Sequence, residues 1–191
     1  MTTAATIPAR FLAQAERLGD RVAFTTHAAL GAREDRAWTW ADWRDDALAL
    51  ATMLAEPAGP RTARVAILAA NGPLWPIAEM GAMLAGLPTV GIVPRSSAAF
   101  VAALLDDAAC DVVICDDATH LATVCEAVQR RPYTTVVHDA GQDAVEAMHA
   151  RWPVALGGGD DDTGTGMIVL CHWDEWIGLG RMLVDAGMTT A

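Results

Sequence analysis

Lysine is absent from this chain of 191 residues, because all 13 basic residues are arginine, and 24 aspartates and glutamates oppose them. The resulting formal net charge is −11. Nucleic acids and anionic membranes are bound by clustered cations, whereas these arginines stand singly except for Arg130 and Arg131. We therefore expect neither nucleic acid nor a membrane as a partner.

Long hydrophobic runs are missing as well. The longest apolar stretch, residues 76–94, is interrupted by Glu79 and Pro88, which predicts a buried helix and a strand instead of a membrane span. The N-terminus has neither the basic start nor the continuous apolar core of a signal peptide. These absences predict a cytoplasmic protein.

The chain also lacks closely paired cysteines. The chain has four cysteines and no C-x-x-C pair: Cys110, Cys115, Cys125 and Cys171. In a reducing cytosol we expect them to remain thiols. A metal site built from Cys115, His120 and Cys125 can be drawn, but buried structural cysteine is far commoner than such a site. We therefore expect no metal site.

What the chain does contain is the pattern of an α/β fold. Hydrophobic residues make up 53% of the chain and charged residues 19%, which is typical of a folded globular domain. From residue 63 onward, strand-like apolar runs alternate with helical patterns. The predicted strands are 63–69, 88–93, 111–115 and 134–138, and the predicted helices are 73–85, 97–107, 119–130 and 142–150. This alternation predicts a three-layer, mostly parallel sheet with helices on both faces.

The first part of the chain predicts a smaller set of elements, namely a helix at 8–19, strands at 21–26 and 36–39, and a helix that starts at Trp40. Thr39 and Asp42 have the spacing of a capping box for that second helix. Its apolar stripe comprises Trp40, Trp43, Ala47, Leu50 and Leu54, while Asp42, Arg44, Asp45 and Asp46 lie largely off it. We interpret the tryptophans as core residues.

The end of the chain is set apart by a tract of glycine and aspartate at 157–166. We expect residues 1–156 to form the main α/β subdomain, 157–166 a connection, and 167–191 a C-terminal strand–helix segment. Trp173 and Trp176 in this last segment would form an apolar patch suited to a partner if they were exposed.

A set of short motifs carries a family resemblance by its order and spacing. The motifs are Thr-Trp-Ala-Asp-Trp at 39–43, Arg-Val-Ala-Ile-Leu at 64–68, Asn-Gly-Pro at 71–73, Met-Gly-Ala-x-x-Ala-Gly at 80–86, Val-Pro at 93–94 and the run LLDDAACDVVICDD at 104–117. Over about residues 7–150 the chain resembles the N-terminal region of adenylate-forming ligases, which include acyl-CoA synthetases, nonribosomal-peptide adenylation domains and luciferases. The resemblance implies the fold of the first subdomain of those enzymes, and it supports a fold more strongly than an activity.

The same resemblance identifies a degenerate phosphate loop. In the family, a Ser/Thr/Gly-rich loop that ends in Pro-Lys-Gly holds ATP, and the matching residues here are Thr163, Gly164, Thr165 and Gly166. This loop lacks the Pro-Lys-Gly, and the aspartates at 160–162 precede it. Carboxylates repel a triphosphate unless a metal bridges them. We therefore expect no cofactor, with ATP and Mg²⁺ bound only if a partner completes the site.

Two polar clusters are candidates for other chemistry. One is Asp116, Asp117 and His120 at the end of a predicted strand, and the other is His172, Asp174 and Glu175. Parallel sheets bind ligands at the carboxyl ends of their strands, so acid–base catalysis by His172, Asp116 or His120 is one hypothesis. A polar strand-to-helix turn without function explains the same residues.

The sequence leaves three functions open. The first is a truncated, ATP-incompetent ligase relative that serves as an accessory or interaction subunit in an acyl-activating pathway. The second is one half of a split acyl- or aryl-CoA ligase that is completed in trans. The third is a small ATP-independent enzyme or acyl-ligand-binding domain. For the first two we expect a homo-oligomer or a partner protein that covers the exposed lobe interface.

Overall fold

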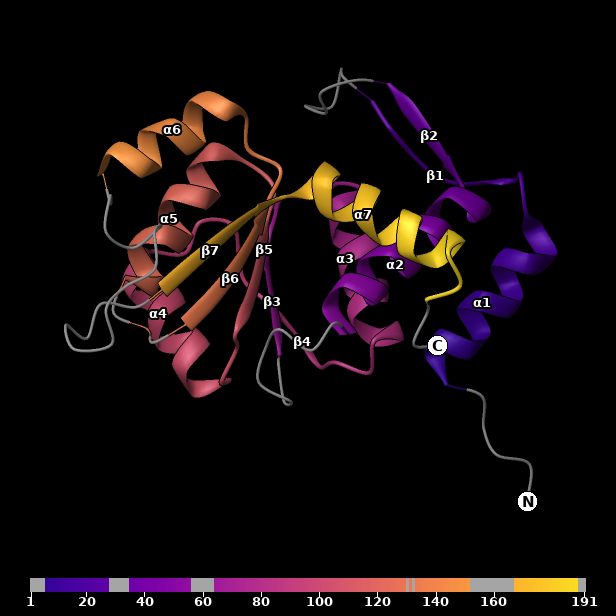
Figure 1. The fold of residues 1–191 in the computed structure, drawn as a ribbon, viewed down its shortest axis with the longest axis horizontal. Helices are drawn as coiled ribbons and strands as arrows, with labels where there is room; N and C mark the ends of the chain where they lie inside the picture. Colours follow the sequence, from indigo (N-terminus) through magenta and orange to yellow (C-terminus); the bar gives the residue numbers. More distant parts are fainter. Residues whose placement is uncertain are drawn as a thin grey trace. The chain divides into compact units, whose positions relative to one another are not determined.

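The structure is a computed structural model that describes residues 6–27, 35–55, 64–129, 131, 133–151 and 167–188. These residues form two compact units, which Figure 1 shows with their elements labelled. The helical unit takes in residues 1–56, 71–86 and 177–191, and the sheet unit takes in 57–70 and 87–176. Among the helices that the structure describes, none is both long and apolar enough to traverse a bilayer.

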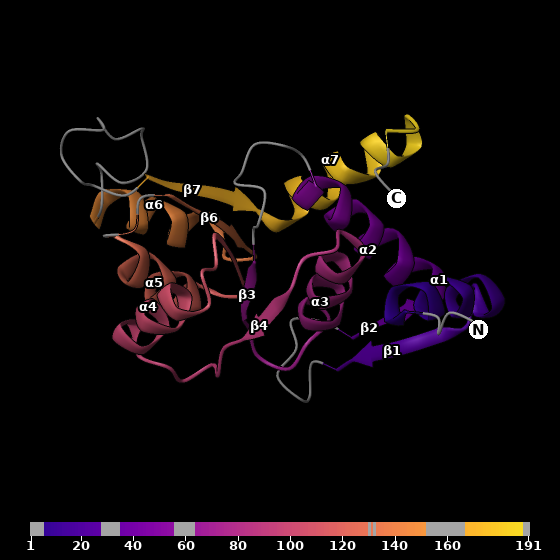
Figure 2. The same ribbon diagram turned by 90° about the horizontal axis from the view of Figure 1, so that it is seen from below.

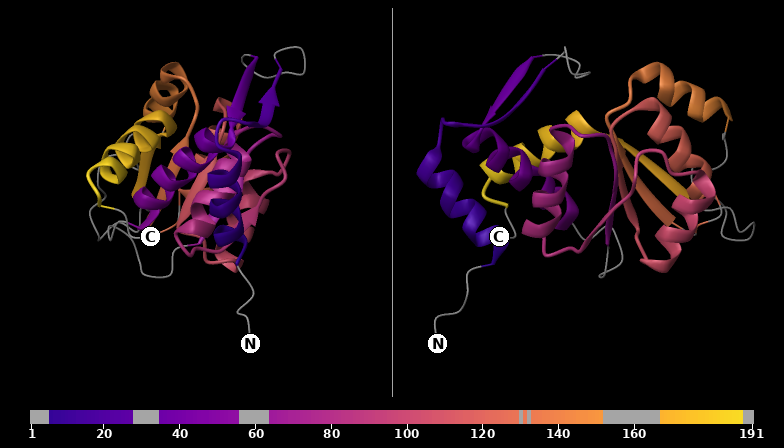
Figure 3. Two further views of the ribbon diagram at one scale, coloured as in Figure 1. Left: turned by 90° about the vertical axis from the view of Figure 1, so that its right-hand side faces the viewer. Right: turned by 180° about the vertical axis from the view of Figure 1, so that it is seen from behind.

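The helical unit is built from helices and one antiparallel hairpin. Its elements are α1 (Ile7–Leu18), β1 (Val22–Thr26), β2 (Arg36–Thr39), α2 (Trp40–Ala55), α3 (Leu74–Leu84) and most of α7 (Trp173–Asp185), and the paired strands stand out in Figure 3. The predicted capping box is confirmed, since the amide of Asp42 donates to Thr39 Oγ1 at 3.0 Å and the amide of Thr39 donates to Asp42 Oδ2 at 2.9 Å. The amides of Thr39 and Asp42 have no carbonyl of the preceding helical turn to bond to, and these two side chains pair them instead. This explains why α2 starts at Trp40.

The tryptophans of the helical unit pack together as predicted. The ring of Phe11 lies 4.7 Å from that of Trp43 in an edge-on contact, and Trp40 lies 5.4 Å from Trp43. Trp43 also donates its Nε1 hydrogen to the carbonyl of Pro76 at 3.1 Å, which ties α2 to α3. These rings therefore belong to the core and not to a binding surface.

The burial of Asp46 departs from the sequence-based prediction. Asp46 is 7% exposed and forms an ion pair with Arg181 of α7, although we expected it off the apolar stripe of α2. The reason is that α2 is covered on more than one side, because α3 packs near Leu50 at Gly81 and α7 packs against Ala49 at Gly180. Desolvation raises the pKa of Asp46, and the charge of Arg181 opposes that rise.

The sheet unit holds a five-stranded parallel sheet in the order β4-β3-β5-β6-β7. The strands are β3 (Val65–Leu68), β4 (Thr89–Gly91), β5 (Val112–Cys115), β6 (Tyr133–His138) and β7 (Met167–His172). The helices α4 (Ala98–Asp107), α5 (Ala118–Val128) and α6 (Gln142–Arg151) lie together on one face of this sheet, as Figures 1 and 2 show. The predicted α/β fold, with a parallel sheet flanked by helices, is confirmed.

The core of the sheet unit lies between the strands and these helices. Every residue of β3 and β5 is buried, which is why both strands read as continuous apolar runs in the sequence. The residues that pack with them include Val101, Leu105, Leu121, Val124, Val128 and Val136. Cys110, Cys115 and Cys125 belong to the same core.

The strand order creates a switch point between β3 and β5. From β3 the chain crosses to β4 on one side, whereas from β5 it continues to β6 and β7 on the other. The loops that leave the carboxyl ends of β3 and β5 therefore run in opposite directions, and ligands of open α/β sheets bind at such points. This placement makes the carboxyl ends of the strands, here called the carboxyl edge, the first place to look for a site.

Candidate functional site

The carboxyl edge gathers the polar residues that follow each strand. The register sets Leu68 level with Cys115, Cys115 level with His138, and His138 level with His172. The residues that come directly after these positions must therefore meet along a single edge. Both candidate clusters of the sequence lie there.

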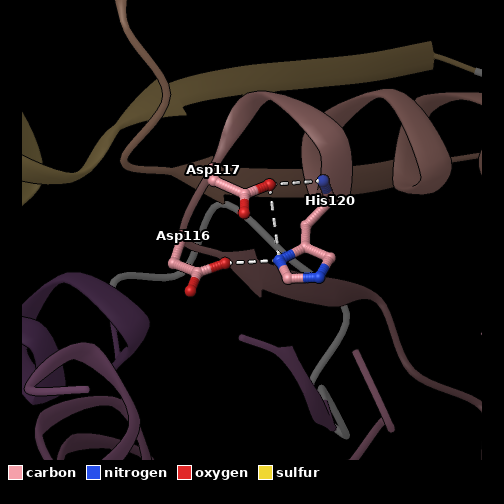
Figure 4. Close-up of side chains that lie close together, drawn as sticks. All are labelled: Asp116, Asp117 and His120. Atoms are coloured by element: carbon pink, nitrogen blue, oxygen red, sulfur yellow. Dashed lines mark hydrogen bonds and ion pairs between the residues drawn. The ribbon is translucent and has the colours of Figure 1, made fainter. Parts of the chain in front are cut away.

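The first cluster is Asp116, Asp117 and His120, which Figure 4 shows converging on one point. Asp117 caps α5 by accepting the amide hydrogen of His120 at 2.7 Å, and this turn brings the imidazole back over the strand end. His120 Nδ1 lies 2.5 Å from Asp116 Oδ1 and 3.4 Å from Asp117 Oδ1. The sequence predicted this cluster, and the structure brings its members within reach of one another.

Two partners from elsewhere in the chain hold the cluster. His120 Nε2 lies 3.0 Å from the carbonyl oxygen of Pro94, which follows β4. The amide of Ala70, which follows β3, donates to Asp116 Oδ2 at 2.8 Å. The cluster therefore links the loops after three adjacent strands, β4, β3 and β5, at the switch point.

These contacts make His120 a poor acid–base catalyst. Its side chain is 8% exposed, and both ring nitrogens already face a partner within the sheet unit. A general base needs a free lone pair within hydrogen-bonding distance of the substrate proton. The geometry thus favours a role for His120 that needs no proton transfer, either in holding the loops together or in binding a small cation.

The second cluster is larger than the sequence indicated, because His138 and Asp139 join His172 and Asp174. One ligand atom from each of Asp139, His172 and Asp174 lies within 4.8 Å of the others. The rings of His138 and His172 meet edge to face with centroids 5.4 Å apart. We missed His138 and Asp139, although their place directly after the predicted strand 134–138 was a usable signal.

Local hydrogen bonds set the tautomers in the second cluster. The amide of Ala140 donates to His138 Nδ1, and the amide of Asp174 donates to His172 Nδ1, both at 3.3 Å. A neutral imidazole that accepts at Nδ1 carries its hydrogen at Nε2. Burial, and next the neighbouring His172, lower the pKa of His138, so its neutral form is favoured.

Burial disfavours the thiolate form of the cysteines. Burial raises the pKa of Cys125 to about 12, and burial raises the pKa of Cys115 as well. A cysteine binds a metal as its thiolate, and the Nδ1 atom of His120 faces Asp116. Burial of the two thiols therefore disfavours a site made of Cys115, His120 and Cys125.

The remaining predicted site residues divide into two groups. Thr163, Gly164, Thr165 and Gly166 lie outside the residues that the structure describes. Trp173 and Trp176 are half-buried, so they do not form the fully exposed apolar patch considered from the sequence. Trp176 also forms a hydrogen bond with Cys171 that opposes the burial-driven rise in the pKa of this thiol.

The described part of the carboxyl edge is strongly acidic. The residues that follow β3, β4, β5, β6 and β7 within the sheet unit include Asp116, Asp117, Asp139, Asp174 and Glu175, against a single arginine, Arg95. Polyphosphates are held by amide hydrogens and cations, and a net negative edge repels them. This edge suits a cation better than a free nucleotide.

Comparison with known proteins accounts for the fold. The sequence profile described as AMP-binding enzyme matches residues 11–158. No curated protein matches the sequence at a significant level.

Several solved structures share the fold at low sequence identity. The A-PCP didomain of carboxylic acid reductase from Segniliparus rugosus, in complex with AMP, superposes with a TM-score of 0.74 and 18% identity over 95% of this chain and 27% of that one. The adenylation domain of the carboxylate reductase from Mycobacterium chelonae gives 0.67 and 17% over 93% of this chain and 29% of that one. A benzoate CoA ligase from Burkholderia xenovorans gives 0.62 and 14% over 90% of this chain and 28% of that one.

The chain thus spans less than a third of the length of each of these structures. At such identities the likeness shows the fold, and it agrees with the ligase-like fold that the motifs predicted. The profile covers most of the sequence, and on that match the chain belongs to the family of AMP-binding enzymes.

Proposed function

We propose that this chain acts as an accessory or interaction subunit of an acyl-activating system and does not bind ATP productively by itself. The net charge of −11 is the single observation that carries the proposal, and the acidic side chains of the carboxyl edge, which outnumber its one arginine, agree with it. The sequence adds that no lysine is available anywhere in the chain. An enzyme of this family that activates a carboxylate must hold a triphosphate, and here the charges oppose that task.

Exposed apolar side chains support a role in association. In the helical unit, Leu179 is 47% exposed, Met182 69% and Met188 56%. In the sheet unit, Val93 is 67% exposed and Phe100 54%. Leu179 and Met182 lie one turn apart on α7, and neighbouring exposed apolar side chains are typical of protein interfaces. We propose that the rest of an adenylating enzyme, or a second copy of this chain, covers them.

The nucleotide part of the proposal is tested on the isolated, untagged chain. A site filled at roughly 100 times its Kd would add about 2.7 kcal/mol to the free energy of unfolding. We expect no shift of the melting temperature with millimolar ATP and Mg²⁺, and no exchange of pyrophosphate into ATP with a set of aliphatic and aromatic carboxylates. Clear stabilisation by ATP, or measurable exchange, would refute ATP incompetence.

The association part is tested by size-exclusion chromatography with light scattering. We expect a mass above that of one chain, or a co-purifying partner, and Met182→Asp should reduce either one. Asp185→Asn, which changes an exposed residue at the end of the same helix, is the matched control and should leave the mass unchanged. A folded monomer that captures no partner would contradict the proposal.

A split ligase is the second candidate, and the fold shared with the adenylation domains of carboxylic acid reductases favours it. In this case a polypeptide with an intact Pro-Lys-Gly loop and a C-terminal lysine would restore carboxylate-dependent pyrophosphate exchange when mixed with this chain. The accessory proposal expects no activity that depends on both polypeptides. The mixing experiment therefore separates the two candidates.

A further inference from the structure

The hydrogen-bond pattern around His120 requires a cation at one defined point. A carbonyl oxygen only accepts, so the contact of Nε2 with the carbonyl of Pro94 at 3.0 Å places a hydrogen on Nε2. In the neutral ring, Nδ1 then carries a lone pair, which faces Asp116 Oδ1 at 2.5 Å. Two lone pairs do not approach so closely unless a proton or a metal ion lies between them.

Asp117 makes this point better suited to a metal than to a proton alone. Its Oδ1 lies 3.4 Å from the same Nδ1 atom, so one nitrogen and two carboxylate oxygens surround the point. Ligands of a divalent metal at bond lengths of about 2.1 Å lie roughly 3.3 Å apart. The contact with Asp117 already has this spacing, and the contact with Asp116 must widen by less than about 1 Å.

Hydrogen bonds to neighbouring groups hold the three ligand side chains in place, as is usual for the ligands of a metal. A histidine that binds a metal typically donates its other ring hydrogen to a carbonyl or a carboxylate, and Pro94 supplies that acceptor here. The carboxylate of Asp116 is fixed by the amide of Ala70, and that of Asp117 by the amide of His120. The contacts with Pro94 and Ala70 come from outside the cluster, from the ends of other strands.

The site is accessible to an ion from solvent on one side. His120 is 8% exposed and Asp116 22%, whereas Asp117 is 49% exposed. An ion can therefore enter past Asp117, and water can fill its remaining coordination positions. One imidazole and two carboxylates suit a first-row divalent cation such as Zn²⁺ or Mn²⁺.

We propose that Asp116, Asp117 and His120 form a binding site for a divalent transition-metal ion at the switch point of the sheet. The ion takes the place of the proton between Nδ1 and Asp116, and that proton leaves to solvent. This site shares only His120 with the cysteine-based site considered from the sequence, and it does not depend on the proposed accessory role. From the sequence alone we expected no metal site.

The experiment is isothermal titration calorimetry of the untagged, EDTA-treated chain with Zn²⁺ and with Mn²⁺. We expect one ion per chain, with release of up to about one proton, measured from the dependence of the heat on the buffer. Asp117→Asn should weaken the affinity at least about tenfold, because it removes a charged ligand. Asparagine caps a helix as well as aspartate does, so α5 keeps its start and the variant should fold.

Asp174→Asn is the matched control in the second cluster and should change the affinity less than about twofold, because Asp174 contacts none of the three ligands. Co²⁺ gives a second readout, since its absorption spectrum distinguishes thiolate from oxygen and nitrogen ligands. No uptake by the parent chain, equal affinity in Asp117→Asn, loss of affinity in Asp174→Asn, or a thiolate band with Co²⁺ would each overturn the proposal. In the first of these outcomes, the cation between His120 and Asp116 is a proton.

Discussion

Replacing Gly180 by alanine should destabilise the protein far more than a buried methyl group usually does. A Cβ atom at this position would lie 2.2 Å from the carbonyl oxygen of Ala49 and 2.6 Å from its carbonyl carbon. Both atoms belong to the backbone of α2, so no side-chain rotation relieves the contact. α7 would have to move away from α2 by about 1 Å to restore ordinary packing.

The size of the effect follows from two opposing contributions. Overpacking in a rigid core destabilises by about 1–3 kcal/mol, and a clash with backbone belongs at the upper end of that range. Moving α7 also strains the ion pair of Arg181 with the buried Asp46. Alanine restores about 1 kcal/mol of helix propensity that glycine lacks. We expect a net loss of about 2 kcal/mol in the free energy of unfolding.

Gly178 provides the matched control within the same helix. It is exposed, and a Cβ atom there would meet nothing within 4 Å, so only the helix-propensity gain remains. Gly178→Ala should therefore stabilise by about 0.8–1 kcal/mol. Urea unfolding followed by circular dichroism measures both variants. If Gly180→Ala also stabilises the chain, α7 does not approach α2 as closely as described, and the reasoning fails.

Three further predictions concern single residues. Thr39→Ala should lower the free energy of unfolding by about 1 kcal/mol, because the amide of Asp42 loses its acceptor Oγ1 and Asp42 Oδ2 loses the hydroxyl donor, while the backbone amide of residue 39 keeps its bond to Asp42; urea unfolding that shows no loss would contradict this. Ala109 has a φ of 50°, so Ala109→Gly should raise stability by about 0.5–1 kcal/mol, whereas Ala109→Val should lower it. His138 has a lowered pKa, so the unfolded chain binds more protons than the folded chain near and below pH 6.5. Stability should therefore fall as the pH drops through 6.5, and thermal melts of His138→Gln should show a weaker dependence.

The acidic carboxyl edge should repel nucleotides unless a cation is bound there. A nucleotide or an acyl adenylate approaching this edge alone meets the carboxylates of Asp116, Asp117 and Asp139. A divalent ion bound by the first two would reduce that repulsion. Binding assays with nucleotides are therefore informative both with EDTA and with Zn²⁺ or Mn²⁺ present.

Local chemistry made much of the fold predictable from sequence. The strands β3 and β5 are continuous apolar runs because both of their faces are buried, and the start of α2 is encoded by Thr39 and Asp42. Both signals depend on residues close together in the chain, so they can be read without the tertiary structure. The cluster of Asp116, Asp117 and His120 was predicted for the same reason, since all three fall within one strand-to-helix turn.

Contacts between distant segments could not be read from the sequence. His120 meets Pro94, 26 residues away, which fixes the tautomer on which the proposed metal site depends. Asp116 meets Ala70, 46 residues away, whose amide holds the carboxylate in place. Asp46 is buried because α7 packs against α2, and its charge is paired with Arg181 of α7, 135 residues later in the chain.

The sequence by itself determined which segments become strands and helices, because hydrophobic periodicity and capping act over a few residues. Only the tertiary structure decided that β5, β6 and β7 lie side by side in register, and so brought Asp139 next to His172 and Asp174. Strand order is set by the packing of all elements at once, and a local pattern carries no record of it.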